Sequence, residues 1–143
     1  MLSRRGFGGS LAGAAMMPES GARRRAFEPS GSAYSQAFLV SAPTQWLFVS
    51  GQVPQDAAGS VPTGFDAQCR LAWANVERRL VDAGMALGDI VKLTIFLASR
   101  EHRAANTAIR HGILGDHSPA ITIVVADIFD AAWLIEIDVI ACR

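Results

Sequence analysis

The fold is decided by one stretch of the chain, Asp89-Ile90-Val91-Lys92-Leu93-Thr94-Ile95-Phe96-Leu97. It is largely apolar and rich in β-branched residues, and it continues to Ala98 before the polar residues Ser99-Arg100-Glu101. A short apolar run between polar breakers predicts a strand, here residues 90–98, that is covered on both faces. The other elements of the domain are therefore expected to pack around this strand.

Two helices are predicted, one on each side of that strand in the sequence. The first spans about residues 65–83, where apolar and small side chains recur at helical spacing: Phe65, Cys69, Ala72, Trp73, Val76, Leu80 and Ala83. Gly84 ends it, because glycine readily adopts the left-handed conformation found after a helix. The second helix spans residues 102–114 and ends at Gly115.

Four further strands complete the expected fold. Residues 34–40 and 45–53 carry strand-type side chains and are split by Ala42-Pro43-Thr44, which predicts a hairpin. Residues 120–128 and 133–141 are expected to form the last two strands. The resulting order, ββαβαββ, is typical of the α+β class and predicts a single mixed sheet with both helices on one face.

The composition is that of one globular domain and argues against several classes of function. Of the 143 residues, 50% are hydrophobic and 18% are charged, and the 13 basic and 13 acidic residues cancel. A nucleic-acid partner is not favoured, because neutralising phosphates needs a basic surplus. The sequence has no phosphate loop, dinucleotide fingerprint or zinc motif, so no cofactor is expected. His102, His111 and His117 do not share a helix turn, which gives no indication of a metal site.

Residues 1–30 differ from the rest of the chain and are interpreted as an N-terminal extension, which leaves residues 31–143 as the domain. Ser3-Arg4-Arg5-Gly6-Phe7 resembles a twin-arginine export signal, and Ala12-Gly13-Ala14 resembles a cleavage pattern. The stretch between them is too short and too rich in glycine to span a bilayer. The alternative is an unprocessed or mis-started extension, because Arg23-Arg24-Arg25 follows closely. The location therefore stays open between the cytoplasm and export to the periplasm.

Several segments together resemble the Rid family of reactive-intermediate deaminases, also called YjgF or RidA-like proteins. They are the stretch quoted above, Tyr34-Ser35-Gln36, Phe48-Val49-Ser50-Gly51-Gln52-Val53-Pro54, Gln68-Cys69-Arg70 with Asn75, and His117-Ser118-Pro119-Ala120-Ile121-Thr122-Ile123-Val124. The resemblance covers about residues 33–143. It implies a chorismate-mutase-like fold and a homotrimer whose pockets lie in clefts between neighbouring subunits.

Deaminating members of this family hydrolyse an enamine or imine, left by pyridoxal-phosphate enzymes, to a carbonyl compound and ammonia. The resemblance assigns three catalytic residues here. Glu136 acts through a water, and Tyr34 and Ser50 line the pocket. It also places Gly51 and Asn106 among the substrate-binding residues.

Two further substrate-binding positions depart from the family pattern. After Pro-Ala, deaminating members carry an arginine whose fork holds the substrate carboxylate through two parallel hydrogen bonds, and this chain carries Ile121. Ile123 stands where some members have a cysteine. The pair predicts a substrate other than the typical 2-imino acids, unless another arginine compensates. The candidates for that role are Arg103, Arg110 and Arg143.

Glu136 is the strongest catalytic candidate on physical grounds. It lies in a strand of Trp, Leu, Ile and Val, where a carboxylate is partly desolvated and suited to proton transfer, and it shares a strand face with Asp138. The alternative is a carboxylate at an interface, paired with an arginine of a neighbour. In the same way, Tyr34 could simply pack against the hairpin, and Ser50 could bond only the turn backbone.

Two functions from different classes remain open from the sequence. The first is hydrolytic deamination of a small enamine or imine in a cleft between subunits. The alternative is a trimer that binds a small molecule without turnover, for which apolar Ile121 and Ile123 would suit a less charged ligand. A ribonuclease, a label often attached to the family, is not favoured because the chain has no basic stripe.

Overall fold

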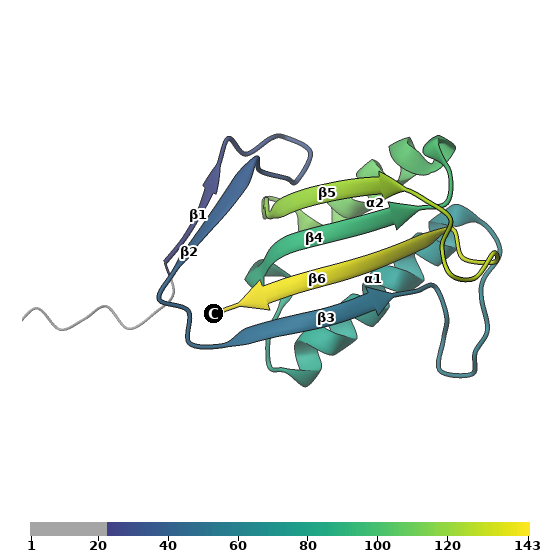
Figure 1. Ribbon diagram of the computed structural model, residues 1–143, viewed down its shortest axis with the longest axis horizontal. Coiled ribbons are helices and arrows are strands. Elements are labelled where there is room, and N and C mark those ends of the chain that lie inside the picture. Colours follow the sequence, from purple (N-terminus) through teal and green to yellow (C-terminus); the bar gives the residue numbers. More distant parts are fainter. Residues whose placement is uncertain (1–22) are drawn as a thin grey trace, which may run out of the picture.

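The computed structural model describes residues 23–143 (Figure 1). Its elements follow in the order β1 (Arg23–Phe27), β2 (Ala37–Ser41), β3 (Trp46–Gln52), α1 (Phe65–Asp82), η1 (Leu87–Asp89), β4 (Ile90–Leu97), η2 (Arg100–His102), α2 (Arg103–Leu114), β5 (Ala120–Val125) and β6 (Ile135–Cys142). One strand thus precedes the predicted ββαβαββ order. The export-signal motif lies outside the described residues.

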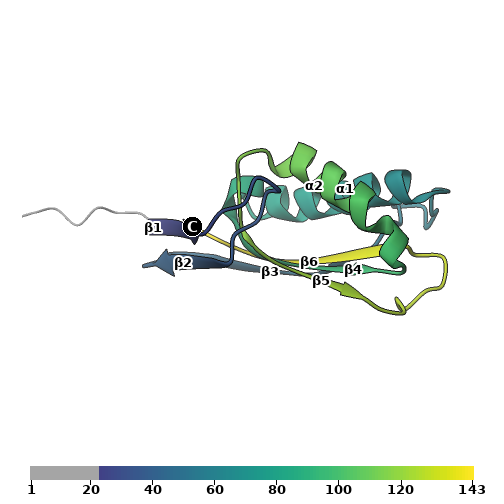
Figure 2. The ribbon, with the colours of Figure 1, turned by 90° about the horizontal axis from the view of Figure 1, so that it is seen from above.

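Four of the strands form one mixed sheet in the order β3-β6-β4-β5. Strand β4 pairs in parallel with β5 and antiparallel with β6, which pairs antiparallel with β3. Helices α1 and α2 both lie on one face of this sheet, and no element of the described chain covers the other face (Figure 2). The α+β class and the placement of both helices on one face of a mixed sheet are therefore confirmed.

The core lies between the helices and the central strands. In β4, Leu93, Ile95 and Leu97 are buried on the helix-covered face, whereas alternate residues on the open face are only half-buried. Trp73 and Leu80 of α1 are buried against them, and each such side chain contributes about 1.5–3 kcal/mol of burial free energy. Within one chain, β4 is thus fully covered on one face and not on both.

The predicted hairpin between residues 34–40 and 45–53 is wrong. Strand β2 pairs with β1 in a separate two-stranded sheet, and β3 pairs with β6. The chain turns away after β2 because the backbone N–H groups of Thr44 and Gln45 both donate to the carbonyl of Arg143, at 2.7 and 2.9 Å. These bonds carry the chain to the C-terminal end of β6 instead of back along β2.

The arginine cluster 23–25 belongs to the described fold, which therefore begins before residue 31. Arg24 Nη1 donates to the carbonyl of Gly88 and to the carboxylate of Asp89, each at 2.9 Å. The Arg25 guanidinium lies 4.1 Å from the ring centre of Phe27. Strand β1 is thus tied to the turn before β4 although its own composition does not resemble a strand. No helix within residues 23–143 has the length and apolarity needed to cross a bilayer.

Replacing Arg24 with alanine should loosen β1 and β2 without unfolding the four-stranded sheet. The substitution removes three charge-assisted hydrogen bonds, one of them a longer bond of 3.4 Å to the Cys142 carbonyl. Because Arg24 and Asp89 are partly exposed, the free energy of unfolding should fall by about 1–2 kcal/mol. Hydrogen exchange should become faster in β1 and β2 and stay unchanged in β4 and β6. Arg78→Ala, on the exposed side of α1, is the matched control. Equal loss of protection in both sheets would contradict the anchoring role of Arg24.

Candidate functional site

The predicted site residues fall into two groups on opposite faces of the four-stranded sheet. Ile121 pairs with Leu93 and Ile123 pairs with Ile95, so both isoleucines share the helix-covered face. Glu136 pairs with Phe96 and belongs to the open face. Because successive side chains of a strand point to opposite sides, the two groups cannot meet within one chain.

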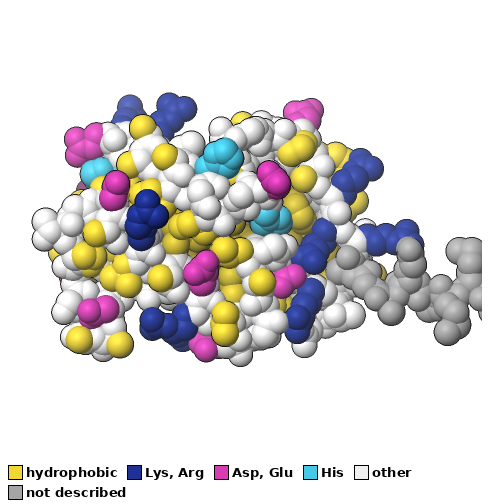
Figure 3. Space-filling view, turned by 180° about the vertical axis from the view of Figure 1, so that it is seen from behind, with side chains coloured by type: hydrophobic (Ala, Val, Ile, Leu, Met, Phe, Trp, Pro, Cys, Tyr) yellow, Lys and Arg dark blue, Asp and Glu magenta, His cyan; other side chains and the backbone are white. Residues whose placement is uncertain are grey.

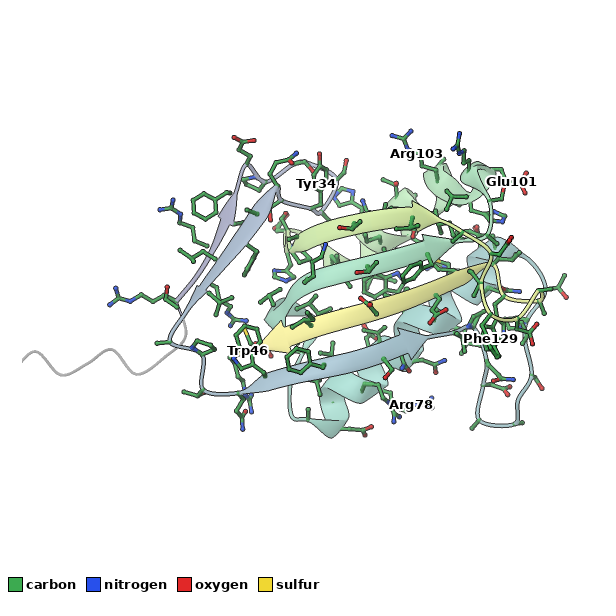
Figure 4. The ribbon with its side chains drawn as sticks, in the orientation of Figure 1. Tyr34, Trp46, Arg78, Glu101, Arg103 and Phe129 are labelled. Atoms are coloured by element: carbon green, nitrogen blue, oxygen red, sulfur yellow. The ribbon has the colours of Figure 1, made fainter. Side chains whose placement is uncertain are left out.

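The first group lines a cavity of about 320 Å³ between α2 and β5. Its lining residues are Ser32, Tyr34, Arg103, Thr107, Arg110, Ile121 and Ile123. Two backbone hydrogen bonds hold Tyr34 at the start of β5. The N–H of its neighbour Ser35 donates to the Pro119 carbonyl at 2.9 Å, and the Tyr34 carbonyl accepts from the N–H of Ser30 at 2.8 Å. Tyr34 and Arg103 both lie along the β5 edge, far from Trp46 and Arg78 on the β3 side (Figure 4).

Helical spacing accounts for the other polar lining residues. Arg103, Thr107 and Arg110 stand four and three residues apart on α2, so they follow one another along a single side of the helix. Both arginines were predicted as candidates, but Thr107 was not, although its spacing from them on α2 places it on the same side of the helix. It also missed Ser32, whose place depends on the loop before β2 and leaves no local signal.

Arg110 is the most unusual side chain of this cavity. Only 3% of the residue is exposed, and its Nη2 donates to the Ser32 carbonyl at 2.9 Å. Its Nε and Nη1 are buried and have no hydrogen-bond partner in the described part of the chain. Burial lowers the pKa of Arg110 below its usual value, and nearby Cys69 and Tyr34 offset that effect only in part.

Of the two other arginine candidates, only Arg103 lies at the cavity. It is exposed and lines the cavity together with Arg110. Arg143 lies elsewhere, where its Nε donates to Gln45 at 3.1 Å and its Nη1 donates to the Gly84 carbonyl at 2.8 Å. The cavity therefore holds two cationic side chains beside two isoleucines.

The second group lies where β3 and β6 run side by side. The Glu136 carboxylate is seated directly on Gly51, and any side chain at position 51 would occupy the same space. Glu136 and Asp138 share the open face, as predicted, and both are half-buried. Ser50 is exposed on β3, beside a shallow hollow that Asp138 also lines. A carboxylate, a second acid and a hydroxyl thus lie together on this face.

Asn106 belongs to neither group. It is fully buried on the inner side of α2, and neither its Nδ2 nor its Oδ1 has a hydrogen-bond partner among the described residues. It stands one helical turn before Arg110 but is not among the residues that line the cavity. A buried amide without hydrogen-bond partners costs free energy, so an apolar side chain would be expected at this position of α2.

His102, His117 and Cys69 are accounted for by packing, and His111 is exposed on α2. Within residues 23–143, no three His, Cys, Asp or Glu side chains are grouped so that they could hold a metal ion. His102 stacks on Phe65 with ring centres 4.4 Å apart, and His117 Nε2 lies 2.7 Å from the Ile90 carbonyl. Burial raises the pKa of the Cys69 thiol to about 12, so this cysteine stays protonated and unreactive.

A four-stranded mixed sheet of this topology with a glutamate in its last strand is the arrangement that the resemblance to the Rid class of small α+β proteins implies. The family model described as Endoribonuclease L-PSP matches residues 24–143. The 2-iminobutanoate/2-iminopropanoate deaminase of Escherichia coli is 33% identical over 101 residues, which cover 68% of this chain and 79% of that protein. The chain belongs to the YjgF/Rid family.

Two further comparisons agree with this assignment. TdcF of Escherichia coli, provisionally assigned as a reactive intermediate deaminase, is 32% identical over 72 residues, so the match spans 50% of this chain and only 56% of that relative's length. The crystal structure of YyfB from Yersinia pestis, a Rid family protein of unknown function, is similar with a TM-score of 0.76 and 25% identity. That match covers 84% of this chain and 98% of YyfB.

Replacing Gly51 with alanine should displace Glu136 while leaving the fold intact. The added methyl group meets the flexible end of the Glu136 side chain, which can swing away, so the free energy of unfolding should change by less than about 1 kcal/mol. The NMR resonance of the Glu136 carboxyl carbon should shift. Gly112→Ala, which places a methyl group in open space on α2, should instead add about 0.5–1 kcal/mol of stability. An unshifted Glu136 resonance in Gly51→Ala would refute this contact.

Proposed function

We propose that this protein hydrolyses a small imine or enamine to a carbonyl compound and ammonia, in a cleft that a second copy of the chain completes. The observation that carries the proposal is the placement of Glu136, a half-buried carboxylate fixed on Gly51. A relative that is 33% identical is a 2-iminobutanoate/2-iminopropanoate deaminase, which supports the same class of reaction here.

The need for a second copy follows from the two faces of the sheet. Tyr34 and Ile121 line the helix-side cavity, whereas Glu136 and Ser50 occupy the open face. A substrate held by the first group can reach a carboxylate only if another subunit brings its open face to the β5 edge. We therefore include a homotrimer in the proposal, as the family resemblance implies.

Exposed apolar side chains support such an assembly. Phe48 is 72% exposed and Trp46 is 51% exposed on β3, where their rings stack 6.4 Å apart. On the β5 edge, Ile123, Val124 and Val125 are 36–45% exposed. Apolar side chains along both edge strands of a sheet are a liability in a free monomer and are typical of surfaces that become buried between subunits.

The proposed reaction needs only water and a proton-transfer group. Water, oriented by Ser50 and deprotonated by Glu136, adds to the carbon of the protonated C=N bond. The proton that Glu136 gained then passes to the nitrogen of the tetrahedral intermediate. The C–N bond breaks, ammonia leaves, and the second proton of the water is released as the carbonyl forms. Tyr34 donates its hydroxyl to the substrate from the cavity side.

The substrate is proposed to differ from the typical short 2-imino acids. In deaminating relatives an arginine at the position of Ile121 would pair with a carboxylate next to the C=N carbon, and isoleucine offers no hydrogen bond there.

On the helix-covered side, acidic and basic side chains are interspersed (Figure 3). The formal net charge of the whole chain is +0, and neither this charge nor the mixed surface supports a nuclease, although the matching family model is described as Endoribonuclease L-PSP.

A non-catalytic binding protein is the second candidate. The isoleucines of the cavity favour it, because they form an apolar wall beside which a small molecule can be held without reaction. The two functions differ in one measurement. A deaminase releases ammonia from freshly generated imine faster than the solvent reaction, whereas a binding protein saturates with ligand and releases none.

A homotrimer should be observed in solution. Sedimentation equilibrium of the full chain at micromolar concentration should give about three times the monomer mass. Phe48→Asp should shift the population towards monomer, because a charge on the exposed apolar face opposes its burial. Val81→Asp is the control, since Val81 is also exposed but lies on α1. A stable wild-type monomer would refute the shared site together with the trimer.

Ile121→Arg should increase hydrolysis of 2-iminopropionate. Wild-type protein should be slower than an arginine-containing relative by on the order of 10²–10³-fold in kcat/KM, because an unpaired carboxylate in a desolvated cleft costs about 3–5 kcal/mol. The variant should recover part of this loss, and adding Glu136→Gln should abolish the gain because an amide cannot transfer the proton. Val81→Arg, on the exposed side of α1 and outside the cavity lining, is the control.

Two results would contradict this account. Wild-type activity equal to that of the relative would show that the carboxylate is already held by another group in the same place. A gain in Ile121→Arg that survives Glu136→Gln would show that Glu136 does not transfer the proton.

A further inference from the structure

The cavity between α2 and β5 contains a buried cation without a buried anion. Only 3% of Arg110 is exposed to solvent. Its one hydrogen bond is to a neutral acceptor, the Ser32 carbonyl. Its Nε and Nη1 make no hydrogen bond within residues 23–143. A guanidinium in this state carries an uncompensated desolvation cost, which a carboxylate would relieve through the two parallel hydrogen bonds of an arginine fork.

The remaining lining residues match an anionic ligand with an apolar part. The lining contains two arginines, two isoleucines and three hydroxyl groups, from Ser32, Tyr34 and Thr107, and it contains no aspartate or glutamate. A cationic ligand would therefore meet only like charge. The volume, about 320 Å³, suits a small molecule of several carbon atoms.

We propose that Arg110 anchors the carboxylate of the substrate from the helix side, and that the substrate is an imine or enamine whose carboxylate is separated from the C=N carbon by an apolar spacer. This inference rests on the proposed function for its reaction and on the cavity for its ligand class. It makes Arg110 a specificity-determining residue supplied by α2, at the wall that faces Ile121 on β5.

The spacer follows from the depth at which each residue lies. Arg110 is buried at the inner wall, Ile121 is half-buried, and Ile123 and Arg103 are exposed at the mouth. A carboxylate bound to Arg110 therefore lies inside the cavity, whereas the C=N bond has to lie towards the mouth, where the Glu136 of a second copy can approach. A carboxylate bonded directly to the C=N carbon cannot satisfy both ends.

A structural role for Arg110 predicts a different result. If its purpose were to fix the loop before β2 through the Ser32 carbonyl, its replacement would lower the melting temperature but would not alter any preference between charged and neutral ligands. The two roles therefore separate in a comparison of hexanoate with hexanamide, which share an apolar chain of similar size and differ in charge.

The experiment is titration calorimetry of the full chain with hexanoate and with hexanamide. Wild-type protein should bind hexanoate at least about tenfold more tightly than hexanamide, since charge-assisted bonds to a buried arginine exceed those to an amide. Arg110→Lys should weaken hexanoate binding about tenfold, because lysine lacks the planar fork. Arg110→Met should remove the preference for hexanoate altogether. Arg78→Met, which loses one positive charge on the distant β3 side (Figure 4), should bind as wild type does.

The proposal is overturned if wild-type protein shows no preference for hexanoate, or if Arg110→Lys and Arg110→Met keep the wild-type preference. Should Arg110→Met fail to fold, Arg110→Lys decides the question alone. Failure of the proposed function gives a different pattern, because hexanoate binding that depends on Arg110 would then occur without ammonia release from any imine. Ammonia release with ligand preferences indifferent to Arg110 would instead reject the anchor and keep the deaminase.

Discussion

The alternation of side chains in β4 and β6 is the constraint on which the rest of the structure depends. One side of both strands is apolar and is sealed by α1 and α2, so the odd-numbered residues of 93–97 in β4 and of 135–141 in β6 are committed to the core. The even-numbered residues between them must then emerge on the other face, whatever their chemistry. Glu136 and Asp138 reach the open face for this reason, and Ile121 and Ile123 are confined to the helix side because β5 pairs in register with β4.

The same constraint divides the proposed chemistry between two chains. A group that binds the substrate from the helix side and a group that transfers a proton from the open face are separated by the thickness of the sheet. Activity would therefore require assembly, and the protein would have no partial site that could react with an imine before subunits meet. The polar side chains buried in α2, Asn106 and Arg110, are placed on the binding side of this division.

Much of the fold could be predicted from local sequence, and the failures have physical reasons. The spacing of Phe65, Trp73 and Leu80, with Gly84 at φ 70°, determines α1 to within a residue. Strand β1 could not be predicted because its three arginines resemble a solvated segment. Without β1 as a partner for β2, a hairpin of β2 with β3 was the simplest prediction. The half-buried position of Glu136 could be predicted from its apolar neighbours. The sequence could not show which of the candidate arginines lies at the cavity, because long-range contacts place them. Arg110 is held by its bond to the Ser32 carbonyl, and Arg143 is held elsewhere by its bond to the Gly84 carbonyl.

The position of β6 also governs when this protein can fold during its synthesis. Strand β6 is synthesised after both β3 and β4, yet it lies between them in the sheet. Until β6 has been synthesised and is free to pair, β3 has no partner on the sheet, and Thr44 and Gln45 lack the Arg143 carbonyl to which they bond. The nascent chain can therefore form α1, α2 and the β4–β5 pair before its sheet closes, because closure needs β6. Until then β3 would present Trp46 and Phe48 beside an unpaired strand edge, which is the period when a chaperone would matter most to this chain.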